Sequence, residues 1–258
     1  FTITENEKTI GAIVVTDADN ETDGDNNINY SVSGSELEIS LAGVLGFVTA
    51  ADFETKNTYT ATITVDDGVF SATQDITINV TNVNDVAPEF TSNPTFTAAE
   101  NQTAIGTVTA TDVEGDDITF TVSGSELAIN SAGDLIFVEA PDFETKDTYT
   151  AILTASDGIN SSNQNITVNI TNVNDVAPVF TSEATLSGAE NQTSIGTVTA
   201  TDVEGDDISF TVTGTELEIT TAGVLTYVDA PDYETKTSYE AVITASDGIN
   251  STTQDIIV

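Results

Sequence analysis

The sequence is dominated by an internal repeat with a period of 90 residues. Residues 81–88 (TNVNDVAP) return at 171–178, and residues 52–56 (DFETK) return at 142–146 and, with one Tyr for Phe, at 232–236. Such a period is typical of an array of small units, each packing mainly against its neighbours. We therefore expect a segment of a longer protein with three similar domains, at residues 1–84, 85–174 and 175–258, the last ending before its own linker.

Within each repeat the local pattern is that of β-strands. Short runs rich in Val, Ile, Thr and aromatic residues alternate with Gly and Asp turns, and no stretch has helical periodicity. In the first repeat we expect an opening strand and further strands at residues 10–15, 28–32, 37–39, 44–48, 59–65 and 76–80. About seven strands per repeat predict an all-β fold of three tandem antiparallel β-sandwiches with Ig-like Greek-key connections, stacked end to end.

The composition is strongly acidic and excludes several classes of function. The 258 residues include 43 Asp plus Glu and four Lys, with no Arg, His, Cys, Met or Trp, for a formal charge of −39. Such a charge is the opposite of what a nucleic-acid binder requires. The absence of His and Cys removes the commonest general base and the nitrogen and sulfur ligands of zinc, copper and iron. No apolar run is long enough for membrane insertion, and we expect no signal peptide within this segment.

Many acidic residues recur in phase at strand ends, whereas acids that served only solubility would scatter over strand faces. Each repeat has a Glu after its first strand, an Asp-x-Glu before its penultimate strand, a Thr-Asp-x-Asp/Glu after its second strand and an Asp-Gly after its penultimate strand. Because strand direction alternates, the first two groups should fall at one pole of a sandwich and the last two at the other. Stacking would bring opposite poles together around the linker.

Such a cluster of carboxylates needs neutralisation, because unpaired charges would repel one another or shift their pKa values upward. The available ligands are all oxygens, from carboxylates, Asn side chains and backbone carbonyls. Ca²⁺ takes about 6–8 oxygen ligands in flexible geometry, whereas Mg²⁺ demands a tight octahedron. The pattern therefore predicts Ca²⁺ at the junctions between repeats.

The same residues carry a resemblance to a known family. The early Glu5, the Asp52-x-Glu54 motif, the linker Asn82-x-Asn84-Asp85-x-Ala-Pro and the loop Thr16-Asp17-Ala18-Asp19 resemble the cadherin repeat, in the form common in large bacterial surface proteins. The resemblance covers the chain three times over. Three departures stand out: Asn82 and Asn172 replace a linker acid, Val follows Asn-Asp, and Glu114 and Glu204 replace a shorter Asp.

The resemblance implies two to three Ca²⁺ per junction. A pair of ions would be held at the first junction by Glu5, Asp52, Glu54, Asp85 and the Val83 carbonyl, and at the second by Glu100, Asp142, Glu144, Asp175 and the Val173 carbonyl. A third ion would lie among Asn84, the Val86 carbonyl, Asp112, Glu114 and Asp157, and among Asn174, the Val176 carbonyl, Asp202, Glu204 and Asp247. Half-sites would stand at the two ends: Asp17, Asp19 and Asp67, and Glu190, Asp232 and Glu234.

Two other metal or catalytic interpretations are weaker. Residues 19–24 resemble the start of an EF-hand loop, but Tyr30 stands where a bidentate carboxylate is needed, so an acidic loop is favoured over an extra ion. Paired carboxylates such as Asp52 and Glu54 could form a glycosidase pair. They occur three times with no cleft implied, and we expect no enzymatic activity.

Two functions remain, and both place the chain outside the cell, on a bacterial surface. The first is a spacer or adhesion module of an adhesin, stiffened by Ca²⁺ and in contact with neighbouring repeats of the same longer chain. The alternative is a module whose repeats themselves bind a polysaccharide or a second copy of the chain. The near-identity of repeats two and three favours a length-setting array, and thus the spacer.

Overall fold

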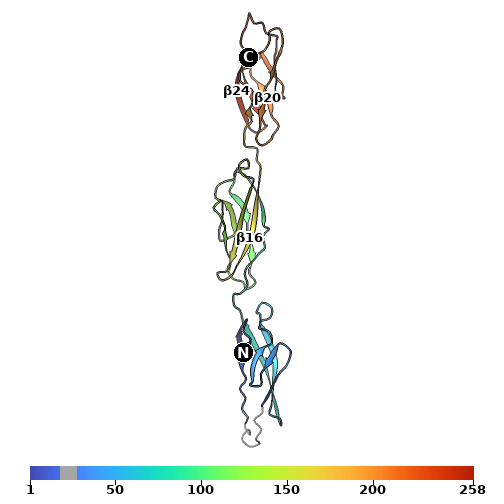
Figure 1. The fold of residues 1–258 in the computed structure, drawn as a ribbon, viewed down its shortest axis with the longest axis vertical. Coiled ribbons are helices and arrows are strands. Elements are labelled where there is room, and N and C mark those ends of the chain that lie inside the picture. The colour runs from blue at the N-terminus through green and yellow to red at the C-terminus, as the bar shows by residue number, and fades with distance from the viewer. Residues whose placement is uncertain (18–27) are drawn as a thin grey trace.

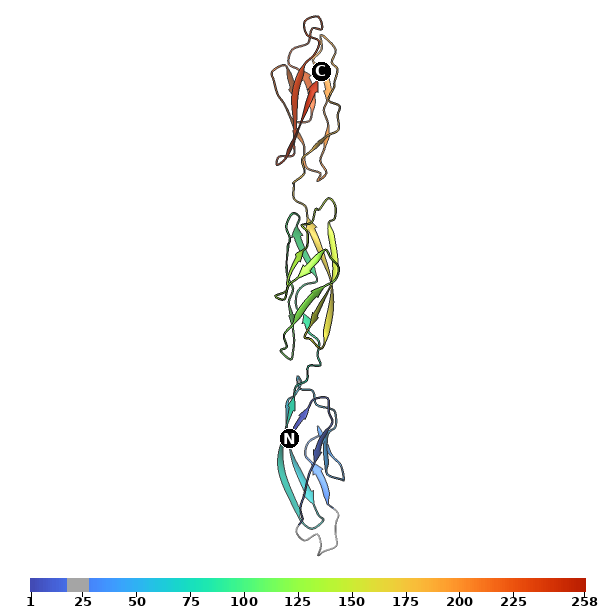
Figure 2. The same ribbon diagram turned by 90° about the vertical axis from the view of Figure 1, so that its left-hand side faces the viewer.

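The computed structural model describes residues 1–17 and 28–258, which form three β-domains arranged in a line. The domains stack end to end, joined by residues 82–88 and 172–178, so the molecule is a long rod (Figures 1 and 2). The prediction of an all-β chain of three tandem domains is therefore confirmed. The described residues include no helix of the length and apolarity that crossing a membrane requires.

The first domain is a sandwich of two sheets. One sheet has the strand order β1-β7-β6-β3 and the other the order β2-β5-β4. The bounds are β1 Thr2–Thr4, β2 Thr9–Ala12, β3 Asn29–Val32, β4 Leu37–Ile39, β5 Val44–Phe47, β6 Thr58–Asp66 and β7 Ser71–Thr81.

The second domain repeats this arrangement and adds a short pair of strands. Its sheets have the orders β12-β15-β16-β9 and β10-β14-β13, and β8 pairs with β11. The bounds are β8 Glu89–Phe90, β9 Thr95–Ala99, β10 Ala104–Thr107, β11 Ala110–Thr111, β12 Thr119–Val122, β13 Leu127–Ile129, β14 Asp134–Phe137, β15 Thr148–Ser156 and β16 Ser161–Thr171.

The third domain repeats the second except for the opening strand, which is reduced to an isolated parallel bridge between Thr185 and Ile257. Its sheets have the orders β20-β23-β24 and β18-β22-β21, and β17 pairs with β19. The bounds are β17 Val179–Phe180, β18 Ser194–Thr197, β19 Ala200–Thr201, β20 Ser209–Val212, β21 Leu217–Ile219, β22 Val224–Tyr227, β23 Glu240–Ser246 and β24 Ser251–Ile257.

One feature differs from the purely antiparallel sandwich expected. The opening strand lies beside the last strand of its own domain and runs parallel to it, with Thr2 opposite Asn79 in the first domain and Thr95 opposite Thr167 in the second. Strand periodicity cannot reveal this, because the partners are more than 70 residues apart and either direction exposes the same side-chain faces. The pairing matters for function, since it delivers the residue after the opening strand to the pole where the last strand ends.

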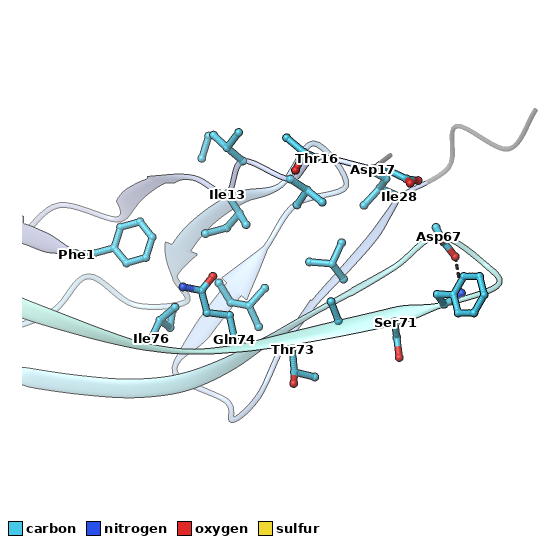
Figure 3. Close-up of a pocket in the computed structure, with 17 residues that line it drawn as sticks. Phe1, Ile13, Thr16, Asp17, Ile28, Asp67, Ser71, Thr73, Gln74 and Ile76 are labelled. Carbon is cyan, nitrogen blue, oxygen red and sulfur yellow. Dashed lines mark hydrogen bonds between the residues drawn. The ribbon is translucent and has the colours of Figure 1, made fainter. Parts of the chain in front are cut away.

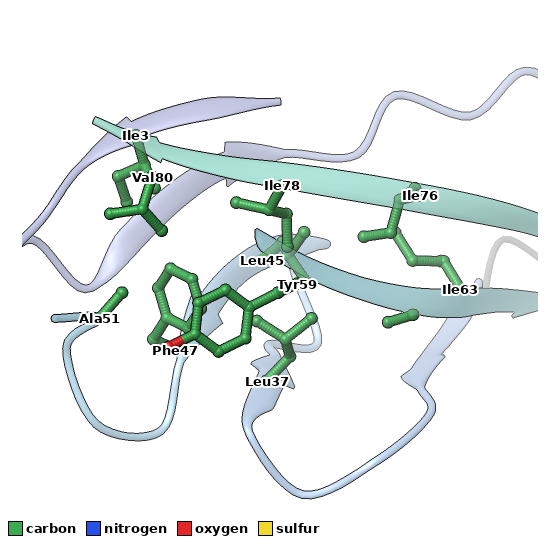
Figure 4. Packing of buried hydrophobic residues seen from close by; sticks show 11 residues of the cluster. Ile3, Leu37, Leu45, Phe47, Ala51, Tyr59, Ile63, Ile76, Ile78 and Val80 are labelled. Atoms are coloured by element: carbon green, nitrogen blue, oxygen red, sulfur yellow. The ribbon is translucent and has the colours of Figure 1, made fainter. Parts of the chain in front are cut away.

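Alternation along the strands explains the cores. In β6 and β7 the apolar side chains point between the sheets while the Thr residues between them face solvent. Leu45 and Ile78 are completely buried, and the ring of Phe47 packs edge-on against Tyr59 with centroids 4.8 Å apart (Figure 4). The equivalent aromatic pair recurs in the other two domains. Each domain therefore has a small core of its own.

The Asp-Gly turns are held by their own backbone. In the β6–β7 turn, Asp67 Oδ1 accepts hydrogen bonds from the amides of Val69 and Phe70, and Gly68 has a φ of 93°. Only glycine adopts this conformation at little cost, which explains Gly after each of these aspartates. The turn fixes one carboxylate oxygen of each Asp and leaves the other available at the pole.

A matched pair of adjacent residues tests the packing of the second domain. Leu153 is fully buried, whereas Ile152, its neighbour on β15, is 45% exposed. We expect Leu153→Ala to lower the free energy of unfolding of this domain by about 2–5 kcal/mol, because it leaves a cavity in the core. Ile152→Ala should cost about 1 kcal/mol or less. Denaturant titration followed by hydrogen exchange would measure both, and equal losses would contradict this packing.

Candidate functional site

The linker after each domain is held from both sides by glutamate side chains. In the first junction Glu5 Oε1 accepts a hydrogen bond from the Val83 amide (2.6 Å), while the two carboxylate oxygens of Glu114 accept from the amides of Asp85 (3.1 Å) and Val86 (3.0 Å). Glu5 belongs to the first domain and Glu114 to the second. The second junction repeats this arrangement with Glu100, Glu204, Val173, Asp175 and Val176.

These glutamates belong to a group of carboxylates that spans the junction. Glu5, Glu54, Asp85 and Glu114 each place one oxygen so that all four lie within 4.8 Å of one another. The second junction gathers Glu100, Glu144, Asp175 and Glu204 within the same limit. Since Ca²⁺–O distances are 2.3–2.6 Å, two ligands of one ion can be no more than about 5 Å apart. Both groups meet this requirement.

Whether a metal ion fits the junctions depends on the buried carboxylate oxygens that lack a hydrogen-bond donor. At the first junction the buried atoms Glu54 Oε1, Asp112 Oδ2 and Asp157 Oδ2 have no hydrogen-bond partner among the described residues. The second junction leaves the three equivalent atoms, on Glu144, Asp202 and Asp247, in the same state. A buried carboxylate oxygen without a donor is costly. Each of these residues was predicted as a ligand, and a hard cation would supply the missing partner.

At each junction the domain after the linker forms a second carboxylate group, and the predicted linker residue, Asn84 or Asn174, belongs to this part of the site. Asp112, Glu114 and Asp116 have carboxylate oxygens within 4.8 Å of one another, as do Asp202, Glu204 and Asp206. Asp112 Oδ1 accepts hydrogen bonds from the amides of Glu114 and Gly115, whereas its Oδ2 has no partner among the described residues. Asn84 and Asn174 lie beside Asp157 and Asp247, which interact with their side chains. Glu114 and Glu204 thus contribute to both groups at their junctions.

One pair of predicted ligands forms its hydrogen bonds within its own loop. Both oxygens of Asp52 accept hydrogen bonds from Thr55, one from the backbone amide (3.1 Å) and one from the hydroxyl (2.9 Å). Asp142 makes the same two contacts with Thr145. Neither belongs to the four-carboxylate groups. Their side chains shape the loop that carries Glu54 and Glu144.

The half-sites at the two ends differ from the junctions. Glu190, Asp232 and Glu234 come together within 4.8 Å, and all three are exposed. Glu5 and Glu100, the counterparts of Glu190, are only 3% exposed. At the other end Asp67 holds its turn, Asp17 lies at the end of the described residues 1–17, and Asp19 lies outside the described residues, as does most of the EF-hand-like segment.

Electrostatics reflect the crowding of like charges. Burial raises the pKa of the Glu54 carboxyl above its usual value, and the nearby charges of Glu5 and Glu114 push it in the same direction. Burial likewise raises the pKa of Glu144, where Glu100 and Glu204 add to the effect. For Asp157 and Asp247 burial acts upward, but hydrogen bonds from two backbone amides and from Asn side chains outweigh it, and the pKa is lowered. The ionised form of the Asp157 and Asp247 carboxylates is therefore favoured.

The lysines do not neutralise the junctions. Lys56 pairs with Glu36 (2.6 Å) and lies over the ring of Tyr59, on the flank of the domain, and Lys146 and Lys236 do the same with their own partners. Lys8 donates to the Val48 carbonyl. Among the described residues no salt bridge reaches a carboxylate of either junction group.

Several residues that position the site were missed by the sequence analysis. Asn6 and Asn101 have positive φ values (65° and 62°) and donate side-chain hydrogen bonds to Asp85 and Asp175. Asn160 and Asn250 donate to the side-chain and backbone oxygens of Asn84 and Asn174. The sequence carries a signal for these residues. Asn6 and Asn101 directly follow the early Glu of their repeats, and Asn160 and Asn250 stand two residues after an Asp-Gly pair.

Comparison with known proteins gives one consistent likeness. No family model matches the chain. Human Protocadherin Fat 4 is 30% identical in an alignment of 181 residues that covers 63% of this chain and 4% of that protein. Drosophila melanogaster Cadherin-99C is 28% identical over 264 residues, covering 88% of this chain and 15% of that protein. The chain thus spans a small part of these curated relatives.

Solved structures support the same fold. The crystal structure of mouse Cadherin-23 EC22-24 superposes with a TM-score of 0.74 at 19% identity, covering 99% of this chain and 92% of that one. At this identity the likeness concerns the fold alone. Together with the curated relatives it identifies the three sandwiches as cadherin-like repeat domains.

Because the pKa of Glu54 is raised, replacing this residue should change stability in opposite directions with and without bound metal. A carboxyl whose pKa is raised by folding stabilises the fold at low pH, and that stability is lost as pH rises through the folded value. In chelator, Glu54→Gln should therefore increase thermal stability at pH 7 and have little effect near pH 4. In Ca²⁺ at pH 7 the same change should lower stability, because a ligand is lost.

The matched control is Glu38→Gln, at an exposed position on β4. It should leave the melting temperature unchanged within about 1–2 °C in each condition. If Glu54→Gln destabilised the chain equally with and without Ca²⁺ at pH 7, the electrostatic description of the junction would be wrong.

Proposed function

We propose that this chain is a calcium-stiffened spacer and adhesion module of a larger extracellular protein, with Ca²⁺ bound where successive repeats meet. The observation that carries the proposal is that three buried carboxylate oxygens lack a donor at each junction, at equivalent positions in both. A structural surface cluster would be expected to place such oxygens in solvent or against donors. A divalent cation satisfies them and offsets the repulsion at once.

The negative charge of the junction carboxylates indicates how many Ca²⁺ ions each junction would bind. The four carboxylates of one group carry a charge of about −4, which two divalent ions balance. The second group around Asp112 and Asp157 adds further oxygens for a third ion, so two to three Ca²⁺ per junction fit. The boundaries at residues 84/85 and 174/175 divide each set between a preceding domain, the linker and a following domain.

The proposed mechanism is mechanical. Without metal, a seven-residue acidic linker is a self-repelling hinge, held by a few hydrogen bonds to glutamates that themselves repel. With metal, ligands from two domains and the linker are fixed to the same ions. Their relative positions then become rigid, because moving one domain would break several coordination bonds at once. Each domain would act as a segment of a stiff rod.

The context of the module follows from the likenesses and is also a proposal. Cadherin-like repeats in tandem are consistent with an extracellular location, a non-enzymatic role and contacts with neighbouring repeats of the same chain. The relatives named above are animal proteins, so a bacterial surface adhesin rests on the sequence resemblance alone. Binding of a polysaccharide or of a second copy by the repeats is the competing hypothesis.

Thermal stability tests the metal. Ca²⁺ at about a thousand times its Kd stabilises the folded state by about 4 kcal/mol per site, and each kcal/mol raises the melting temperature of a domain this size by about 4–8 °C. We therefore expect millimolar Ca²⁺ to raise the melting temperature by more than about 10 °C over chelator, and Mg²⁺ to raise it much less. Superimposable melting curves in chelator and Ca²⁺ would refute the metal site.

Small-angle X-ray scattering tests the mechanism. In Ca²⁺ the chain should scatter as a rigid rod, and in chelator as three linked domains with a shorter average maximum dimension. Asp202→Asn should soften only the second junction and Asp112→Asn only the first, because arrays couple mainly between neighbours. Calorimetric titration should show each variant losing ions from one junction. A flexible ensemble that is the same in both conditions would favour the ligand-binding hypothesis.

A further inference from the structure

The linker after each of the first two domains is bound to the following domain by an asparagine side chain. At the first junction the side-chain amide of Asn160 donates hydrogen bonds to the Oδ1 atom (2.5 Å) and the backbone carbonyl (3.2 Å) of Asn84. At the second junction Asn250 makes the same two bonds with Asn174, at 2.6 and 3.3 Å. Asn160 and Asn250 stand in the turn between the last two strands of their domains. Two neutral amides therefore join each linker to the domain that follows it.

The hydrogen-bond network fixes which way the linker amide points. The Nδ2 atom of Asn174 donates to Asp206 Oδ2 (2.8 Å), so its Oδ1 atom faces Asn250. At the first junction the Asn84 side chain interacts with the carboxylate of Asp157, which can only accept. Flipping either linker amide would set an oxygen against a carboxylate. The linker Oδ1 atom, which the sequence predicts as a calcium ligand, thus has a protein donor at both junctions.

This contact differs in kind from those that the linker makes with the preceding domain. At the second junction Glu100 accepts a hydrogen bond from the Val173 amide (2.7 Å). Asn101 donates to the carboxylate of Asp175. Both bonds use a carboxylate of the four-carboxylate group, and repulsion within that group opposes them when no cation is bound. The two bonds from Asn250 use no carboxylate, so this repulsion does not weaken them.

Burial shows the same asymmetry within the first linker. Asn84 is half-buried and Pro88 is buried, whereas the other residues of 82–88 are exposed. The Pro88 carbonyl accepts a hydrogen bond from the hydroxyl of Ser162, two residues beyond Asn160. The two least exposed linker residues are thus those that neutral side chains of the following domain bind.

The asparagine side chain is not needed to form the turn in which it stands. In the first domain the equivalent residue is Phe70, and Asp67 Oδ1 accepts a hydrogen bond from its backbone amide at 2.6 Å (Figure 3). In the second domain Asp157 Oδ1 accepts from the Asn160 amide at the same distance. Because the backbone closes the turn with either side chain, the side-chain amide of Asn160 is available to bind the linker.

We propose that Asn160 and Asn250 are positioning residues that hold the linker on the following domain before any cation binds. The linker and the following domain then form one preorganised half of the junction, which lowers the entropic cost of binding an ion. The hinge of the metal-free chain lies on the other side, at residues 82–83 and 172–173. The holding of the linker needs no metal, whereas its effect on Ca²⁺ affinity rests on the function proposed above.

Hydrogen exchange of the whole chain in chelator, followed by NMR, tests where the hinge lies. The amides of Asp175 and Val176 donate to Glu204 of the following domain, whereas the Val173 amide donates to Glu100 of the preceding one. We expect Asp175 and Val176 to exchange more slowly than Val173, because the linker stays with the following domain. Equally fast exchange at all three amides would overturn the proposal.

Matched variants assign the effect to the asparagine. Asn250→Leu removes the side-chain amide with little change of shape, so exchange in the second linker should become about tenfold faster in chelator. The amides of β23 and β24 should be unchanged, which separates loss of the linker contact from unfolding of the domain. Asn160→Leu should move the effect to the first linker, and Asn165→Leu, at an exposed position on β16, should affect neither.

Titration with Ca²⁺, with exchange in each linker as the readout, tests the consequence for the metal. Asn250→Leu should raise the Ca²⁺ concentration needed to protect the second linker about tenfold and leave the first linker unchanged. If the wild-type chain binds no Ca²⁺, the proposed function fails, and exchange in chelator still decides where the linker is held. If it binds Ca²⁺ but Asn250→Leu alters neither exchange in chelator nor the affinity of the second junction, the positioning role is overturned.

Discussion

The structure depends on an electrostatic conflict at each junction between repeats. Four carboxylates converge within 4.8 Å, three buried carboxylate oxygens lack donors, and the lysines form their ion pairs elsewhere. Two glutamates of the first group are nonetheless held by backbone amides, Glu5 by those of Val83 and Phe53 and Glu114 by those of Asp85 and Val86. Evenly spread surface charge would impose no such geometry. In the function we propose, a cation bound between the domains resolves this conflict, and their relative position would then depend on that cation.

Strand pairing within each sandwich positions these carboxylates at the junction. The parallel pairing of β1 with β7 places Glu5 beside the start of the linker, and its amide donates to the Thr81 carbonyl at the end of β7. Asn6 then turns the chain with a positive φ, and its amide donates to Ala51, just before the loop that carries Glu54. A strand paired antiparallel at this edge would deliver its end to the opposite pole. The one pairing that departs from the expected sandwich thus brings the two acidic motifs together.

How much the sequence predicts follows from which signals are local. Strand positions, the three domains and the separation of acidic motifs between poles follow from alternation and from the 90-residue period. The ligand role of Asp52 stays a prediction, and its carboxylate also accepts hydrogen bonds from the amide and hydroxyl of Thr55, which the sequence analysis did not consider. The dual role of Glu114 was also hidden, since it depends on the longer side chain reaching two linker amides. One strand is shorter than expected: the strand predicted at residues 10–15 is observed as β2, Thr9–Ala12, and residues 13–15 belong to no strand.

Each junction group draws its carboxylates from both sides of the linker. Glu100 is 3% exposed and accepts from the Phe143 amide at 2.7 Å and from the linker amide of Val173. Glu204, from the following domain, accepts from the linker amides of Asp175 and Val176. Since Glu100, Glu144, Asp175 and Glu204 come from two domains and the linker, affinity for a cation should belong to the pair of domains and not to either one alone. This is the property a rod needs if its stiffness is to arise where its segments meet.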